Sequence, residues 1–178
     1  LRRAQEQRTG AEVFTTELED RLVREVAVEQ ALRSALAEHS LSVAYQPKVD
    51  LARSRVSSVE ALCRWQHPEL GFVSPGEFIP AAERTGLIGL LGEQVLETAL
   101  RDVQRMREVA PDVTVSVNVA AAQLQSDRFV DEVRALLERT GTPAAALELE
   151  VVETSVIENI ERAVRVIDEL RETGVAFS

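Results

Sequence analysis

A short strand-like segment carries a carboxylate and a guanidinium that are expected to share one face. In the run V-E-A-L-C-R-W, alternate side chains of a strand point to opposite sides. This places Glu60, Leu62 and Arg64 on one face, and Ala61 and Cys63 on the other. Two interpretations remain open for the charged residues: an ordinary ion-paired or solvated pair on an edge strand, or a pair that acts together on a ligand.

Two further oxygen-bearing side chains lie towards the ends of later strand-like runs. Asn118 ends the run V-T-V-S-V-N, and Glu150 lies near the end of L-E-L-E-V. Because barrels place their chemistry at the carboxyl ends of the strands, both are expected near Glu60. Two carboxylates and an amide oxygen, without a His or Cys cluster nearby, suit Mg²⁺ or Mn²⁺ better than zinc. The alternatives are a turn cap for Asn118 and an outward-facing position for Glu150.

Two loops beside these runs are candidates for the border of the site. Glu153 begins the loop after the run that contains Glu150, where it could support a metal ligand from outside the ligand shell. A helix cap or a solvated loop position is an equal alternative for this residue. The motif P-G-E-F-I-P, from Pro75 to Pro80, combines a restricted backbone with two large apolar side chains. We expect either a loop over the barrel mouth or a tightly packed turn.

The elements that must position these residues alternate between strand and helix patterns. Apolar residues at helical spacing predict an amphipathic helix over Glu17–His39. The later elements are predicted in this order: strands at 41–46 and 56–65 that could form a hairpin, a helix from after Pro80 to about 109, a strand at 113–118, a helix at 126–140, a strand at 147–151, a helix at 158–173 and the start of a strand at 174–177. This alternation favours an α/β fold with a parallel sheet, either doubly wound or a (β/α)8 barrel. A glycine-rich phosphate loop does not follow any strand, which weakens the first option.

Composition and charge narrow the classes of function. The chain has 178 residues, of which 45% are hydrophobic, and a formal net charge of -10. The negative charge argues against binding of a nucleic-acid polymer but leaves open a small anionic ligand held by one or two cations and a metal. Cys63 is the only cysteine, and no stretch has the roughly 18 consecutive apolar residues of a membrane span. We therefore expect a cytoplasmic domain, although its parent protein could be tethered to a membrane.

Several motifs, by their order and spacing, resemble the EAL domain family. The tripeptide E-A-L, which names that family, begins at Glu60 within V-E-A-L-C-R-W-Q-H-P. Y-Q-P begins before it at Tyr45, S-P-G-E-F-I-P follows at Ser74, and E-R-T-G-L-I follows at Glu83. The later segments S-V-N and L-E-L-E-V-V-E match the next two signatures of the family. The resemblance therefore runs from about Glu29 to the last residue.

The resemblance implies a fold and an activity. The fold is a TIM-barrel-like (β/α)8 domain whose first strand runs antiparallel, of which this chain carries the N-terminal two-thirds. The activity is hydrolysis of cyclic di-GMP to linear pGpG with two divalent cations, Mg²⁺ or Mn²⁺. The implied metal ligands are Glu60, Asn118 and Glu150, and Glu60 is also the implied catalytic residue.

The same resemblance assigns roles to four other residues. Arg64 is implied to contact a phosphate of the ligand, and Gln46 to help hold the dinucleotide. Leu62 is implied to line the site beside them. Glu153 resembles the family residue that steadies a loop important for metal binding and dimer contacts.

The family's next motif, Asp-Asp-Phe-Gly-Thr-Gly, is expected directly after the last residues of this chain, with further catalytic residues later still. Two explanations are open: a fragment of a longer product, or a naturally shortened protein. In the first case the full-length domain is expected to be a metal-dependent phosphodiesterase, and the chain alone to be inactive. In the second, it is a receptor for cyclic di-GMP or a regulatory interaction domain without catalysis. Residues 1–16 resemble a connector from a preceding GGDEF domain and 17–178 form the EAL domain, for which a homodimer is the family expectation.

Overall fold

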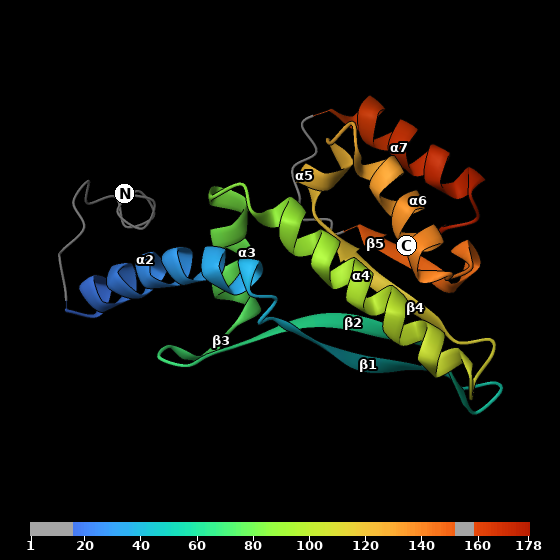
Figure 1. Cartoon of the computed structure of the whole chain (residues 1–178), viewed down its shortest axis with the longest axis horizontal. Helices are drawn as coiled ribbons and strands as arrows, with labels where there is room; N and C mark the ends of the chain where they lie inside the picture. Colours follow the sequence, from blue (N-terminus) through green and yellow to red (C-terminus); the bar gives the residue numbers. More distant parts are fainter. Residues whose placement is uncertain (1–15, 152–158) are drawn as a thin grey trace.

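The computed structural model describes residues 16–151 and 159–178, which form one curved, mixed β-sheet with helices packed on one of its faces (Figure 1). The strand order is β1-β2-β4-β5-β6, and β3 pairs with the end of β2 off this path. The strands are β1 Ser42–Asp50, β2 Arg55–His67, β3 Gly71–Val73, β4 Thr114–Val119, β5 Leu147–Val151 and β6 Ala176–Phe177. The predicted connector at 1–16 lies outside the described residues except for Thr16, which begins the first described helix.

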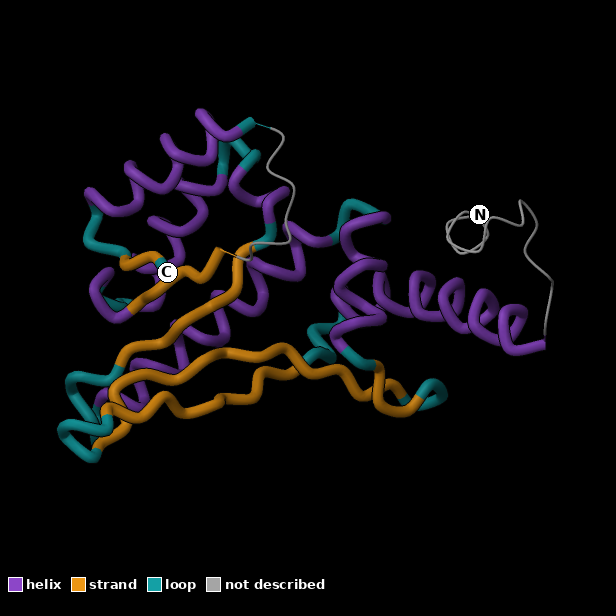
Figure 2. The backbone as a smooth tube through the Cα atoms, turned by 180° about the vertical axis from the view of Figure 1, so that it is seen from behind, coloured by secondary structure: helices purple, strands orange, loops and turns teal. Residues whose placement is uncertain are grey.

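The first two strands form the predicted hairpin, and the later strands are parallel. In the antiparallel β1–β2 pair, Ser42 lies opposite Arg64 at one end and Asp50 opposite Arg55 at the turn. Strands β2, β4, β5 and β6 then pair in parallel, as the strand–helix alternation predicted. Figure 2 shows the long hairpin at one edge of the sheet and the C-terminal strand at the other.

Helices connect the parallel strands and cover one face of the sheet (Figure 1). These helices are α3 Pro75–Arg84, α4 Ile88–Arg107, α5 Ala121–Leu124, α6 Phe129–Thr140 and α7 Ile160–Glu172, with a 3-10 turn at Ala144–Ala146, whereas α2 Thr16–Ala37 precedes the first strand and extends away from the sheet. Helices α4, α6 and α7 contribute to the main core together with β2, β4 and β5. In the part of the chain that the structure describes, no helix is both long and apolar enough to cross a membrane.

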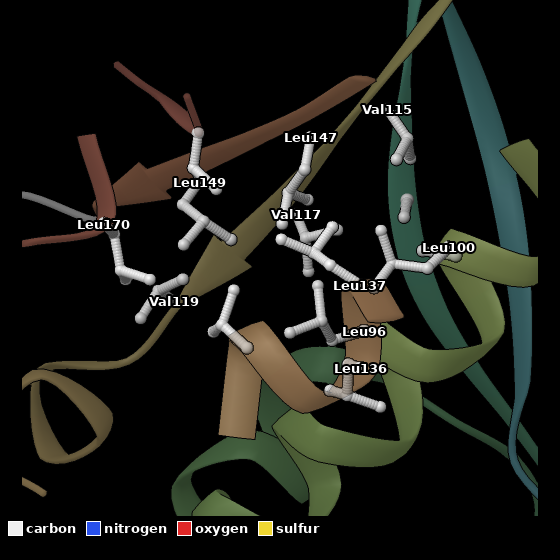
Figure 3. Close-up of a cluster of buried hydrophobic side chains, with 14 of the residues drawn as sticks. Leu96, Leu100, Val115, Val117, Val119, Leu136, Leu137, Leu147, Leu149 and Leu170 are labelled. Carbon is white, nitrogen blue, oxygen red and sulfur yellow. The ribbon is translucent and has the colours of Figure 1, made fainter. Parts of the chain in front are cut away.

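The main core fills the space between the sheet and these helices (Figure 3). Val117 on β4 and Leu149 on β5 point towards Leu96 on α4 and Leu136 on α6, and all four are at most 3% exposed. Burial of one such side chain contributes roughly 1.5–3 kcal/mol to folding. Because alternate residues of a strand face opposite ways, this packing turns the residues between them to the other face of the sheet.

A second core joins α2 and α3 to the end of β2. Trp65 is 1% exposed and meets the ring of Phe78 edge-on, with the ring centroids 6.0 Å apart. Leu32 and Leu36 on α2 complete this cluster. The predicted helix at 17–39 is thus confirmed, but its apolar packing is confined to the second half: Leu22 in the first half is 44% exposed.

The prediction of one helix from after Pro80 to about residue 109 was wrong. Helix α3 begins at Pro75 and contains Pro80, and α4 begins only at Ile88. Between them Gly86 has a φ of 71°, a left-handed conformation that glycine adopts without strain and that ends a helix. The expectation of a loop or tight turn at P-G-E-F-I-P was also wrong: Pro75 occupies the first turn of α3, where proline is tolerated, and the helix continues through Pro80.

Two other elements differ from the prediction in a smaller way. The helix expected from residue 126 begins at Phe129 and is preceded by the short helix α5. Strand β3 was not predicted; it is a three-residue strand that pairs Val73 with Trp65 beyond a turn. Such short elements are fixed by their partners rather than by a pattern of their own.

Candidate functional site

The polar face of the sheet, opposite the main core, brings the predicted residues Glu60 and Asn118 together. Their neighbours Ala61 and Val117 are buried in the main core, so alternation directs Glu60 and Asn118 away from the helices. The side-chain amide of Asn118 donates a hydrogen bond of 2.9 Å to the Glu60 carboxylate. The predicted proximity of these two side chains is therefore present in the structure.

Glu150 lies on the same face, directly opposite Asn118 in the parallel β4–β5 pair. Its carboxylate accepts a hydrogen bond from the ammonium of Lys48 on β1. Strands β2 and β4 separate β1 from β5 in the sheet, so a direct contact between these side chains requires a strongly curved sheet. The polar face is consequently concave, as in the wall of a barrel.

The charges on this face influence one another. Burial by itself lowers the pKa of Lys48, but the hydrogen bond to Glu150 and the nearby charges of Glu148 and Glu60 outweigh it and raise that pKa. Burial by itself raises the pKa of Glu150, yet Lys48 and the hydroxyl of Ser116 outweigh it and lower that pKa. The Ser116 hydroxyl forms no hydrogen bond of good geometry with the residues that the structure describes. The site thus combines a Glu150 carboxylate of lowered pKa with a buried hydroxyl close beside it.

Sequence reasoning missed Lys48 and Ser116. Lys48 shares the strand face of Gln46, since the two are separated by one residue, and this spacing was the available signal. Ser116 sits directly opposite Glu60 in the β2–β4 pair. Its position between Thr114 and Asn118, on the same face of the strand, was the second signal.

Leu62 and Arg64 continue the polar face along β2 and line a cavity of about 530 Å³. The cavity lies between β2, the end of β4 at Asn118, and helices α3 and α4, whose contribution is mostly apolar. The Arg64 guanidinium donates one hydrogen bond of 3.0 Å to the carbonyl of Cys63. It forms no ion pair with Glu60 or with another described carboxylate, so the surface ion pair considered from the sequence is absent here. Its remaining donors are available to an anion.

The absence of a side chain at Gly92 allows helix α4 to pack closely against Gln123 in the wall of the cavity. A Cβ at Gly92 would collide with the side-chain amide of Gln123. That amide is 8% exposed, and its oxygen accepts a hydrogen bond of 3.1 Å from the backbone of Ala120, at the start of α5. Gly92 and Gln123 therefore pack together as one wall of the cavity.

An ion pair fixes helix α3, the opposite wall of the cavity. Arg24 on α2 donates a hydrogen bond of 2.5 Å to Glu77, which also accepts the backbone N–H of Ser74 at the start of α3. The bond from Arg24, followed by that from Ser74, lowers the pKa of Glu77 from 4.5 to about 2. Arg24 also donates to the carbonyls of Leu70 and Phe72 beside β3. A single guanidinium thus ties α2, β3 and α3 together.

Two predicted residues are not part of this cluster as described. Gln46 lies opposite Glu60 in the β1–β2 pair but is exposed, and like Glu60 and Glu150 it does not line the cavity. Glu153 lies outside the described residues. Among the residues that are described, no group of three or more His, Cys, Asp or Glu side chains is placed to hold a metal ion.

Comparison with known proteins agrees with this geometry. A model of the EAL domain matches residues 29–178. The chain belongs to the EAL domain family. It is 39% identical over 172 residues to the cyclic di-GMP phosphodiesterase NbdA of Pseudomonas aeruginosa, covering 96% of this chain and 22% of that protein. It is 35% identical over 162 residues to the cyclic di-GMP phosphodiesterase PdeR of Escherichia coli, covering 91% of this chain and 24% of that protein.

The fold matches a solved EAL structure as well. The PaMucR phosphodiesterase in its c-di-GMP complex superposes with a TM-score of 0.79 at 36% identity, covering 85% of this chain and 62% of that one. The predicted family and the TIM-barrel-like fold with an antiparallel first strand are therefore confirmed. The chain spans about a quarter of the length of the two curated relatives.

Proposed function

We propose that this chain forms part of the active site of a metal-dependent phosphodiesterase that hydrolyses cyclic di-GMP to linear pGpG. The observation that carries the proposal is the contact of Glu60 with Asn118, with Glu150 directly opposite Asn118 in the sheet. The names of NbdA and PdeR support the reaction, and the PaMucR complex supports the ligand.

The donor set on the polar face fits Mg²⁺ or Mn²⁺. Glu60, Asn118 and Glu150 offer oxygen atoms only, which hard divalent cations prefer. The buried Ser116 hydroxyl, which has a free bonding position beside Glu150, provides a further oxygen close to this set. A bound divalent cation would supply an activated water and stabilise charge that develops on the phosphate. The hydrogen bond that Glu60 accepts from Asn118 would orient its carboxylate for binding the cation.

The residues of the cavity would bind and orient the dinucleotide. Arg64, which has no carboxylate partner among the described residues, would donate to a phosphate. Leu62 and the apolar walls of α3 and α4 would exclude water around the base. Gln46 would contact the dinucleotide from the adjacent strand, and Glu153 would steady the loop after β5.

A turnover assay on the full-length protein tests this function. With Mn²⁺, the wild-type protein should convert cyclic di-GMP to pGpG, and Glu60→Ala should reduce turnover by more than about a thousandfold because groups that act as one unit fail together. Glu69→Ala, which changes an exposed carboxylate in the turn after β2, serves as the control and should retain full turnover. Undiminished turnover in Glu60→Ala would refute the assignment. Tight binding of cyclic di-GMP without turnover in the wild-type protein would instead show a receptor or regulatory module.

The proposal extends to the surroundings of the domain. We propose a cytoplasmic EAL domain at 17–178, a connector at 1–16 from an upstream GGDEF or sensor domain, and a homodimer. The long helix α2, whose second half packs against α3, supports a physical connection between an upstream segment and the cavity wall. Size-exclusion chromatography with light scattering on the full-length protein measures the oligomeric state.

A further inference from the structure

Lys48 is the only lysine among the 178 residues, in a chain whose other basic side chains are all arginine or histidine. Its ammonium contacts Glu150 on the polar face, three strands away in the sheet order. A lysine ammonium is a compact, strongly hydrated point charge, whereas a guanidinium is a planar fork. The one residue of the chain that most resembles a small inorganic cation therefore lies against a carboxylate of the candidate metal site.

The surroundings of Lys48 are acidic and include three carboxylates of this face. Glu150 is its hydrogen-bond partner, and Glu148 and Glu60 act on it through their charges. The side chains of Lys48 and Glu150 are 40% and 22% exposed, so their interaction is only partly screened by water. No other basic side chain in the described part of the chain is paired with these three carboxylates.

We propose that Lys48 is a positioning residue that holds Glu150 in place and competes with the divalent cation for that carboxylate, so that it weakens metal affinity. The inference rests on the proposed function, because it takes Glu150 as a metal ligand. The physical reason is that a carboxylate oxygen engaged by an ammonium must release it before it binds another cation. In addition, two positive centres a few ångströms apart repel each other.

The competition predicts opposite effects on stability and on metal binding. Without Lys48, the three carboxylates would face one another uncompensated, so the protein should be less stable in the presence of a chelator. A divalent cation would then relieve more repulsion than it does in the wild-type protein. Lys48→Met removes the charge and keeps an unbranched stem of similar length, whereas Lys48→Arg keeps the charge.

The test measures Mn²⁺ affinity by isothermal titration calorimetry and the Tm with EDTA or with saturating Mn²⁺, using the full-length protein. Lys48→Met should bind Mn²⁺ about tenfold more tightly than wild type, on the scale of one nearby unit charge. Its Tm should be lower than that of wild type in EDTA and should recover with Mn²⁺. Lys48→Arg should stay close to wild type in both measurements.

Each outcome separates this inference from the proposed function. If the wild-type protein turns over cyclic di-GMP with Mn²⁺ but Lys48→Met binds Mn²⁺ equally or more weakly, the Lys48 inference alone is overturned. If Lys48→Met instead loses affinity for cyclic di-GMP at unchanged Mn²⁺ affinity, Lys48 is a ligand contact and the inference is again wrong. If the wild-type protein neither binds Mn²⁺ nor hydrolyses cyclic di-GMP, both the proposed function and the inference about Lys48 are wrong.

Discussion

The two faces of the sheet are made by the same strands but differ in how their side chains are held. On β5, Leu149 is fully buried against the helices, whereas its neighbour Glu150 turns to the polar face and is held by one hydrogen bond from a distant strand. Close packing leaves little freedom for the first residue, while the second depends on a few charged contacts. Packing on the apolar face therefore fixes the backbone positions from which the charged side chains of the polar face project.

The largest expected effect separates the two faces at adjacent residues. Leu149→Ala should lower the free energy of unfolding by about 2–5 kcal/mol, because it removes a fully buried side chain and leaves a cavity. Glu150→Gln, which keeps the shape of its side chain on the opposite face, should change stability by about 1 kcal/mol or less. Denaturant unfolding of both variants measures the difference. Equal losses would show that the polar face is as important for folding as the packed face.

A smaller effect is expected at α3, whose first turn is stabilised by the ion pair of Arg24 with Glu77. Glu77→Gln should lower stability at neutral pH by about 1–2 kcal/mol, the usual range for a helix cap. The pKa of Glu77 is lowered from 4.5 to about 2, so its contribution is complete above pH 4.5 and is lost as the pH falls towards 2.

The measurement for Glu77 is unfolding as a function of pH. Wild type and Glu77→Gln should differ most above pH 4.5 and should converge near pH 2. Arg24→Gln, which removes the partner, should show the same convergence. A constant difference between wild type and Glu77→Gln across this range would contradict the assignment of the ion pair as the source of the stability.

The smallest effect is expected where the packed face itself carries a polar contact. Tyr45 on β1 packs against the main core and donates a hydrogen bond of 2.7 Å to Asp102 on α4. Tyr45→Phe should lower stability by only about 0.5–1 kcal/mol, because Asp102 keeps its bond to Arg105. Thermal unfolding of the variant checks this value. A loss as large as that of Leu149→Ala would erase the distinction between packing and hydrogen bonding on this face.

Local patterns predicted the features of the fold that depend on neighbours in sequence. Strict alternation around Glu60 predicted its strand face, and the S-V-N and L-E-L-E-V segments predicted the parallel strands that bring Asn118 beside Glu60 and Glu150 opposite Asn118. The existence of the hairpin followed from two apolar runs around a turn. These features are set by the period of two in a strand, which is visible in any single segment.

Features that depend on distant partners could not be predicted in this way. Helix α3 was expected to be a loop because of its prolines, but Arg24, 53 residues away from Glu77, stabilises its first turn. Lys48 contacts Glu150, which lies 102 residues later in the sequence, because the sheet is curved. Neither the curvature nor the partner has a local signature in the sequence.

The contact between Gly92 and Gln123 has a consequence for the range of molecules that the cavity could admit. The missing side chain of one residue on α4 allows this helix to approach α5 until the glutamine amide fills the gap. Any larger residue at Gly92 would displace that amide and disturb its hydrogen bond with the Ala120 backbone. The shape of the cavity is thereby set in part by a position in the helix layer, and a substitution there would leave each charged residue of the polar face in place.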